Sequence, residues 1–276
     1  MDFNMNTTWS RGTALVAENF QLLAIIAAVF VLIPSLMIYM AIPDFASFID
    51  PNADPDVMFA QMSENAGPLA FWGILSMVLQ FAGYAAMIAL VGSSRPTVGE
   101  AIKSGFKAVP SVIGALLLFI VAYFIAAFVV MLPVGLLAAA VGSPVIAFIG
   151  PILILAAIIF LMARLSMTMP AIVLEQTANP VTAMMRSWRI TAPHQWGVLG
   201  FWAVLFIAYF VISILVAGVF GVIAALASGA TGSALILGLF NGILAMAIGM
   251  LVCGLTVAMF GQLAGPSTDE VSETFE

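Results

Sequence analysis

Residues Gln21 to Ile42 read QLLAIIAAVFVLIPSLMIYMAI, an apolar run without a charged side chain. A helix rises 1.5 Å per residue, so this run is long enough to cross the hydrocarbon core of a bilayer, which is about 30 Å thick. Backbone N–H and C=O groups find no water there, and a helix pairs all of them within one segment. The stretch therefore predicts a transmembrane α-helix.

Similar apolar runs recur along the chain, and the six predicted spans cover residues 20–42, 68–91, 111–132, 145–163, 197–221 and 238–263. The whole sequence is 64% hydrophobic and 7% charged. A soluble domain is about half apolar and a quarter charged, so this chain has too few charges to solvate a globular surface. We expect an all-α polytopic membrane bundle of about six transmembrane helices, forming a single membrane domain over residues 1–276.

The charged residues predict the orientation of these spans. The loop between the first two spans contains five acidic residues and no basic one: Asp44, Asp50, Asp54, Asp56 and Glu64. With a cytoplasmic N-terminus, all seven basic residues lie on the inner side: Arg11, Arg95, Lys103, Lys107, Arg164, Arg186 and Arg189. This positive-inside pattern predicts a multi-pass membrane protein with both termini and the acidic tail 266–276 in the cytoplasm. It implies no surface for nucleic acid.

Two helix-start signals occur on the predicted inner side. Thr97-Val-Gly-Glu100 is a capping box, and Asn179-Pro180 places an N-cap residue before a proline at the first helical position. They predict short interfacial helices over 98–109 and 180–192. The second would carry an apolar stripe against lipid or the bundle, formed by Val181, Met184, Met185 and Trp188.

The two interfacial segments resemble each other. Lys103-Ser104 precedes Pro110 at the same spacing as Arg186-Ser187 precedes Pro193. We interpret the chain as three repeats, each an interfacial helix followed by a transmembrane hairpin, over 8–91, 97–165 and 179–264. Repeats are common in transporters, but a repeat alone does not establish transport.

The most distinctive stretch is RLSMTMPAIVLE (Arg164–Glu175), followed by Asn179-Pro180 and RSWRIT (Arg186–Thr191). It resembles the membrane domain of glycerophosphoryl diester phosphodiesterases and related uncharacterised bacterial inner-membrane proteins. The resemblance implies a six-helix membrane fold in the inner membrane. In the phosphodiesterases the chemistry belongs to an attached soluble domain, so the resemblance implies no hydrolase activity for this chain.

Charged residues in this stretch form the first candidate site. Glu175 follows three apolar residues, and we expect it near the membrane surface, within salt-bridge range of Arg164, Arg186 or Arg189. We favour an ion pair that fixes the inner loop. The alternative is a site for an anionic headgroup or a partner, built on the arginines.

Polar and small residues inside the spans are further candidates. Gln80 and Asn241 lie deepest, where they would line a substrate path or, as we favour, form interhelical hydrogen bonds. Two pairs of glycines lie four residues apart, Gly238 with Gly242 and Gly261 with Gly265. They predict close helix packing within the chain, and the alternative is dimerisation.

The sequence predicts no enzyme. It has one His and one Cys, His194 and Cys253, and no pattern for general acid–base chemistry, a metal or another cofactor. We expect a non-catalytic protein that acts as a scaffold, assists a partner protein or organises membrane lipid, including anionic headgroups. The alternative is a small transporter or lipid-handling channel. The oligomeric state is not set by these patterns.

The charge distribution gives a direct test of orientation. A reporter fused after Glu276 should be cytoplasmic, and one inserted beside Asp54 should be external. Compartment-specific reporter activity measures both. A cytoplasmic Asp54 would contradict the predicted topology.

Overall fold

The computed structural model describes residues 3–41, 54–92, 96–226 and 230–265, and most of these are helical, with no strand among them. The N-terminal part forms α1 (Met5–Glu18), α2 (Phe20–Ala27), the π-helical turn η1 (Ala28–Leu32), α3 (Ile33–Ala41), α4 (Pro55–Glu64) and α5 (Ala66–Val91). The remainder forms α6 (Val98–Val141), α7 (Pro144–Leu165), α8 (Thr168–Leu174), α9 (Pro180–Thr191), α10 (Gln195–Leu226) and α11 (Ala230–Ala264).

Six candidate membrane spans occur among the described residues, as the hydropathy pattern predicted. Several predicted charges fall outside these residues, namely Asp44, Asp50, Arg95 and the tail 266–276. Helix α4 was not predicted. It begins like α9, because Asp54 precedes Pro55 and its carboxylate accepts a hydrogen bond from the Asp56 N–H at 2.9 Å.

The helices form two compact units. Unit 1 contains the described residues of Met1–Thr8, Pro110–Phe206 and Met259–Glu276, and unit 2 those of Trp9–Val109 and Ile207–Ala258. Helices α1, α6, α10 and α11 each contribute residues to both units.

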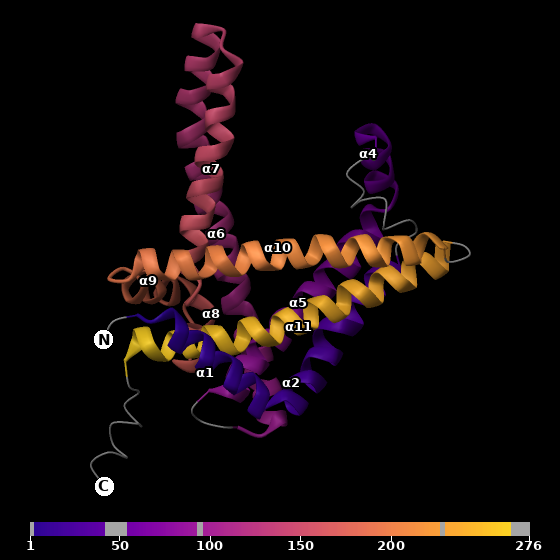
Figure 1. Cartoon of the computed structure of the whole chain (residues 1–276), viewed down its shortest axis with the longest axis vertical. Helices are drawn as coiled ribbons and strands as arrows, with labels where there is room; N and C mark the ends of the chain where they lie inside the picture. The colour runs from indigo at the N-terminus through magenta and orange to yellow at the C-terminus, as the bar shows by residue number, and fades with distance from the viewer. Residues whose placement is uncertain (1–2, 42–53, 93–95, 227–229, 266–276) are drawn as a thin grey trace. The chain divides into compact units, whose positions relative to one another are not determined.

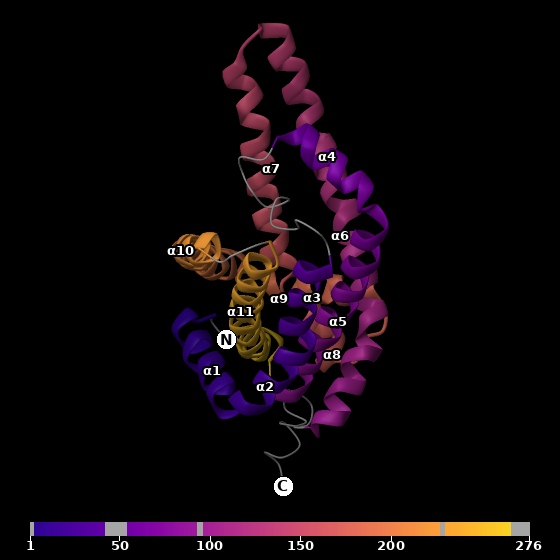
Figure 2. The same ribbon diagram turned by 90° about the vertical axis from the view of Figure 1, so that its right-hand side faces the viewer.

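In unit 2, α2, η1 and α3 pack along α5 (Figure 2). The π-helical turn lies just before Pro34, whose missing N–H removes one donor from the helix ladder. The Ser76 hydroxyl of α5 donates to the Pro34 carbonyl at 3.3 Å. The core here contains Leu23, Ile26 and Met87, which are almost fully buried.

In unit 1, α6 and α7 run antiparallel as a hairpin (Figure 1). The connection contains Gly142 with a φ of +65°, a conformation that costs little energy only for glycine. The hairpin exposes large apolar side chains such as Phe124, Phe128 and Phe148, each more than 60% exposed. Such a surface fits lipid rather than water.

The prediction of a separate interfacial helix over 98–109 is wrong. The capping box does start a helix, since the Thr97 N–H and hydroxyl donate to Glu100 Oε2 at 2.9 and 2.8 Å. However, α6 continues through Pro110 without a break. Proline removes one ladder hydrogen bond, and transmembrane helices tolerate this loss when neighbouring groups satisfy the freed carbonyl.

The other predicted interfacial helix is present as α9. The Asn179 side chain accepts from the N–H groups of Val181 and Thr182, at 2.9 and 3.4 Å. Helix α9 ends at Thr191, and a turn through Pro193 precedes α10. Its orientation in the membrane plane stays a prediction. The three proposed repeats also stay a prediction. Their two better-defined copies differ in structure, because α6 continues through Pro110 whereas α9 ends before Pro193.

The two glycine pairs of α11 behave differently. A Cβ at Gly242 would lie 2.5 Å from Leu32 Cδ1, and one at Gly238 would lie 2.9 Å from Leu36 Cδ1. This pair therefore allows close packing on η1 and α3. A Cβ at Gly261 or Gly265 would meet nothing within 4 Å, and Gly265 instead adopts a φ of +79° after the helix end.

We expect Gly242→Val to lower the melting temperature in detergent by roughly 3–10 °C, because the added isopropyl group would overpack against Leu32. Gly261→Val, in the same helix, is the matched control and should cause no comparable loss. Differential scanning fluorimetry measures both. Equal melting temperatures for the two variants would contradict close packing at Gly242.

Candidate functional site

The first candidate site is built where α7 stops and α8 begins. The break leaves backbone groups without helical partners, and such groups must be paired inside a membrane protein. Ser187 of α9 pairs two of them, because its hydroxyl donates to the Arg164 carbonyl at 2.8 Å and accepts from the Met167 N–H at 3.2 Å. The Thr191 hydroxyl lies 3.2 Å from the same carbonyl.

These bonds fix which face of α9 is buried. The buried side chains are mostly small or polar: Ala183, Ser187, Ile190 and Thr191. The opposite face exposes large apolar side chains, with Val181 47%, Met185 50% and Trp188 40% exposed. Three members of the predicted apolar stripe are therefore exposed, and the fourth, Met184, is half-buried. We call α8, α9 and their connection, residues 168–191, the platform.

Arg164 lies under the platform. It is 4% exposed, and its guanidinium carbon lies 4.1 Å from the centre of the Trp188 ring. Within the part of the chain that the structure describes, its Nε and Nη1 have no hydrogen-bond partner. A buried cation is costly, and the electron-rich face of an indole offsets part of that cost. Trp188 thus covers the cation and keeps its other side exposed.

Glu175 forms the predicted ion pair, and its partner is Arg186. The Arg186 Nε donates to the two Glu175 oxygens at 2.9 and 3.3 Å. The side chains are 39% and 33% exposed, so the pair contributes at most about 1 kcal/mol to stability. The next residue, Gln176, has a φ of +51°, which turns the chain back toward α9.

The four predicted charges therefore do not form one cluster. Arg186 and Glu175 are paired, Arg164 is buried against Trp188, and Arg189 is exposed with no ion pair among the described residues. Sequence reasoning missed the bridging role of Ser187 and the contact between Arg164 and Trp188. The signal for both was the Ser-Trp pair inside the RSWRIT segment.

The loop before α9 is held by α6. The Ser111 hydroxyl donates to the Ala178 carbonyl at 2.6 Å. A Cβ at Gly114 would lie 3.0 Å from Pro180 Cγ, so the chain approaches α6 closely at the first turn of α9. The platform is thus anchored to α6 and α7 within unit 1.

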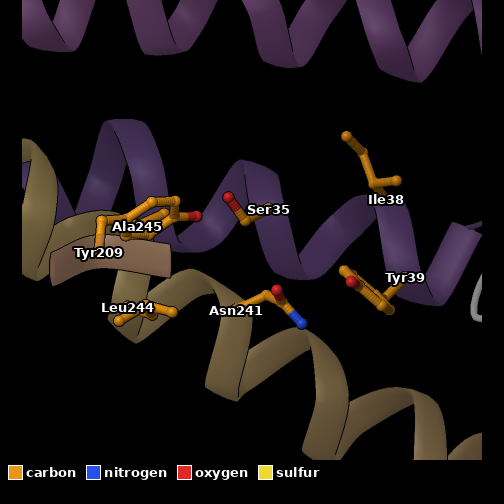
Figure 3. Close-up of a pocket in the computed structure, with 7 residues that line it drawn as sticks. All are labelled: Ser35, Ile38, Tyr39, Tyr209, Asn241, Leu244 and Ala245. Atoms are coloured by element: carbon orange, nitrogen blue, oxygen red, sulfur yellow. The ribbon is translucent and has the colours of Figure 1, made fainter. Parts of the chain in front are cut away.

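The second candidate site is a cavity of about 210 Å³ within unit 2 (Figure 3). It is lined by side chains from α3, α10 and α11: Ser35, Ile38, Tyr39, Tyr209, Asn241, Leu244 and Ala245. Of the two predicted intramembrane polar residues, Asn241 lines the cavity and Gln80 does not. The Asn241 side-chain N–H donates to the Leu237 carbonyl of its own helix at 2.9 Å, and no interhelical bond of Asn241 occurs among the described residues.

The part of the chain that contains the platform is similar to a known membrane domain. Residues 136–270, just under half of the chain, match the family described as the membrane domain of glycerophosphoryl diester phosphodiesterase. The chain is similar to this membrane domain. The match spans α7 to α11, including the platform, and with the six apolar helices it makes the chain a multi-pass integral membrane protein. No curated protein and no solved structure shows significant similarity to the chain.

The remaining residues with reactive side chains are dispersed. His194 lies in the turn before α10, and Cys253 is buried in α11. Among the described residues, no three His, Cys, Asp or Glu side chains form a group that would hold a metal ion.

We expect Ser187→Ala to destabilise the protein by about 1–3 kcal/mol, because the buried Met167 N–H would lose its partner. Ser213→Ala is the matched control, since that hydroxyl is exposed and bonds the Phe210 carbonyl of its own helix. Chemical denaturation in mixed micelles measures both. If the two variants were equally stable, the hydrogen bonds of Ser187 would not stabilise the break between α7 and α8.

Proposed function

We propose that this protein is non-catalytic and that its platform binds the anionic face of a bacterial inner membrane, where it organises lipid. The observation that supports this is the exposed face of α9, which combines Val181, Met185 and Trp188 with Arg186 and Arg189. An apolar face with a tryptophan and flanking arginines is typical of helices that lie in the membrane interface.

On this face, burial of apolar side chains in the membrane contributes more to binding than the positive charge does. Arg186 is partly neutralised by Glu175, which leaves Arg189 as the free positive charge of the platform. One basic residue near an anionic surface contributes about 1 kcal/mol. Burial of the three apolar side chains contributes more, at roughly 25 cal/mol per Å² of apolar surface. The proposed role is therefore a shallow lipid contact with a preference for anionic headgroups.

The proposed orientation follows from charge. With the platform on the cytoplasmic side, its arginines face the leaflet surface that the positive-inside rule assigns to them. Both termini are then cytoplasmic. A protein partner that docks on the same surface is the alternative occupant.

A small transporter or lipid-handling channel is the second candidate function. The observation that favours it is the cavity beside Asn241. The absence of Gln80 from its lining argues against a path defined by both predicted polar residues.

We expect Arg189→Ala to reduce binding of phosphatidylglycerol to the detergent-purified protein by about fivefold, because one free positive charge is lost. Native mass spectrometry of retained lipid measures this, with phosphatidylcholine as the neutral reference. Arg189→Lys is the matched control and should retain the preference, whereas Arg186→Ala with Arg189→Ala should lose it further while the fold is kept. Unchanged phosphatidylglycerol binding in the double variant would contradict a lipid role of the platform.

A further inference from the structure

Arg164 is a buried cation with most of its hydrogen-bond donors unused. It is 4% exposed, and its Nε and Nη1, which carry three of the five guanidinium N–H donors, have no partner among the described residues. Within the same residues no carboxylate forms an ion pair with it, because Glu175 bonds Arg186 instead. A buried charge is costly unless hydrogen bonds or an opposite charge compensate for it. The guanidinium can therefore donate to an added anion.

A second unpaired donor lies one helical turn further along the chain. Thr168 is 8% exposed, and its hydroxyl makes no hydrogen bond among the described residues. Between the two residues the backbone stays close to helical, with φ −59° and ψ −26° at Ser166 and φ −90° and ψ 3° at Met167. Side chains four residues apart on such a backbone are neighbours. Arg164 and Thr168 thus place a charged and a neutral donor on the same side of the chain.

The two serines at this break are hydrogen-bonded, in contrast to Thr168. The Ser166 hydroxyl donates to the Ala163 carbonyl, and the Ser187 hydroxyl donates to the Arg164 carbonyl, both at 2.8 Å. Buried donors are usually paired, and each unpaired one lowers stability. The unused donors of Arg164 and Thr168 are therefore a specific feature of the break and not a sign of generally loose hydrogen bonding there.

Arg164 lies at the level of the bilayer where lipid phosphates begin. From Pro144, the first residue of α7, to Arg164 the helix carries no other charge and rises about 30 Å, which is the thickness of the hydrocarbon core. The next span gives the same level. Thr191, whose hydroxyl lies 3.2 Å from the Arg164 carbonyl, comes four residues before α10 begins at Gln195. Two spans thus reach the edge of the core beside Arg164.

Trp188 covers the guanidinium in this structure. Its ring centre lies 4.1 Å from the guanidinium carbon of Arg164, and the residue is 40% exposed on the apolar face of the platform. An indole face attracts a cation less strongly than a phosphate that accepts charge-assisted hydrogen bonds. Tryptophan also favours the membrane interface. Movement of the indole into the surrounding lipid would therefore uncover Arg164 and keep the ring in a favourable environment.

We propose that Arg164 and Thr168 bind the phosphate group of an anionic membrane lipid, and that this phosphate replaces the Trp188 indole on the guanidinium. The inference rests on the proposed function of the platform and adds to it the residues that recognise the headgroup. Arg186 and Arg189 attract the lipid to the surface, and the buried donors select its phosphate. Inorganic phosphate has the same acceptor oxygens, so the test compares the two sources.

The first measurement follows Trp188 by fluorine NMR of the full chain in detergent, labelled with 5-fluorotryptophan. Trp188→Phe identifies the resonance by its loss. Dioctanoyl phosphatidylglycerol should shift this resonance saturably, because the phosphate displaces the indole. Dioctanoylglycerol, which has the same chains and no phosphate, should not. An equal shift with dioctanoylglycerol would overturn phosphate recognition, and an equal shift with inorganic phosphate at the same concentration would overturn the assignment of a membrane lipid.

Variants locate the binding. Thr168→Val removes only a hydroxyl that has no partner in the lipid-free protein, so the melting temperature should be kept while binding of phosphatidylglycerol weakens about two- to tenfold. Arg164→Gln should abolish the lipid-dependent shift. Thr256→Val is the matched control in α11 of unit 2, since that buried hydroxyl bonds the Cys253 carbonyl of its own helix, and it should bind lipid like wild type. If Arg164→Gln fails to fold, Thr168→Val decides the result.

The outcome is separable from that of the exposed arginines. Wild-type binding of phosphatidylglycerol in both Arg164→Gln and Thr168→Val would overturn this inference, and the proposed function would stand if Arg186→Ala with Arg189→Ala still lost binding. The reverse result, with binding unchanged in that double variant and lost in Arg164→Gln, would contradict the proposed role of the exposed arginines and support the buried phosphate site.

Discussion

The arrangement of the platform depends on the two hydrogen bonds of the Ser187 hydroxyl. A transmembrane helix that stops leaves carbonyl and N–H groups exposed to a medium that cannot bind them. Ser187 donates to the last turn of α7 and accepts from the first residue before α8, so one buried side chain satisfies a group on each side of the break. Because both bonds come from α9, the same contact sets the rotation of α9 about its own axis.

That rotation has consequences for the surface. With Ser187 and Thr191 facing inward, Val181, Met185 and Trp188 face outward. Trp188 then covers the buried guanidinium of Arg164, and Phe160 meets the Trp188 ring edge-on, with the ring centres 6.1 Å apart. A cation with few hydrogen bonds and an exposed tryptophan thus stabilise each other. The exposed ion pair of Glu175 with Arg186 adds little to this energy, because solvent screens it.

The two candidate sites differ in their charge. The platform combines arginines with an exposed apolar surface, and this combination is the basis of the proposed contact with anionic lipid. The cavity near Asn241 is lined by neutral side chains alone. The proposed lipid contact of the platform should therefore weaken with salt, since screening acts on charges.

The sequence by itself determined the features that depend on local chemistry. Hydropathy located the six spans because each must cross the bilayer as one apolar helix, and Thr97 and Asn179 marked helix starts because a cap bonds residues two or three positions away. The Glu175 ion pair was predictable because its partners follow closely in sequence. Only the tertiary structure decided which face of α9 is buried and that Arg164 lies against Trp188. It also decided that α6 continues through Pro110, and that Gly242 packs closely while Gly261 does not. It also brought Ser35, Tyr209 and Asn241 around one cavity. These features depend on contacts between segments far apart in the chain, and in a sequence this uniformly apolar the hydrophobic pattern does not distinguish a face toward protein from a face toward lipid.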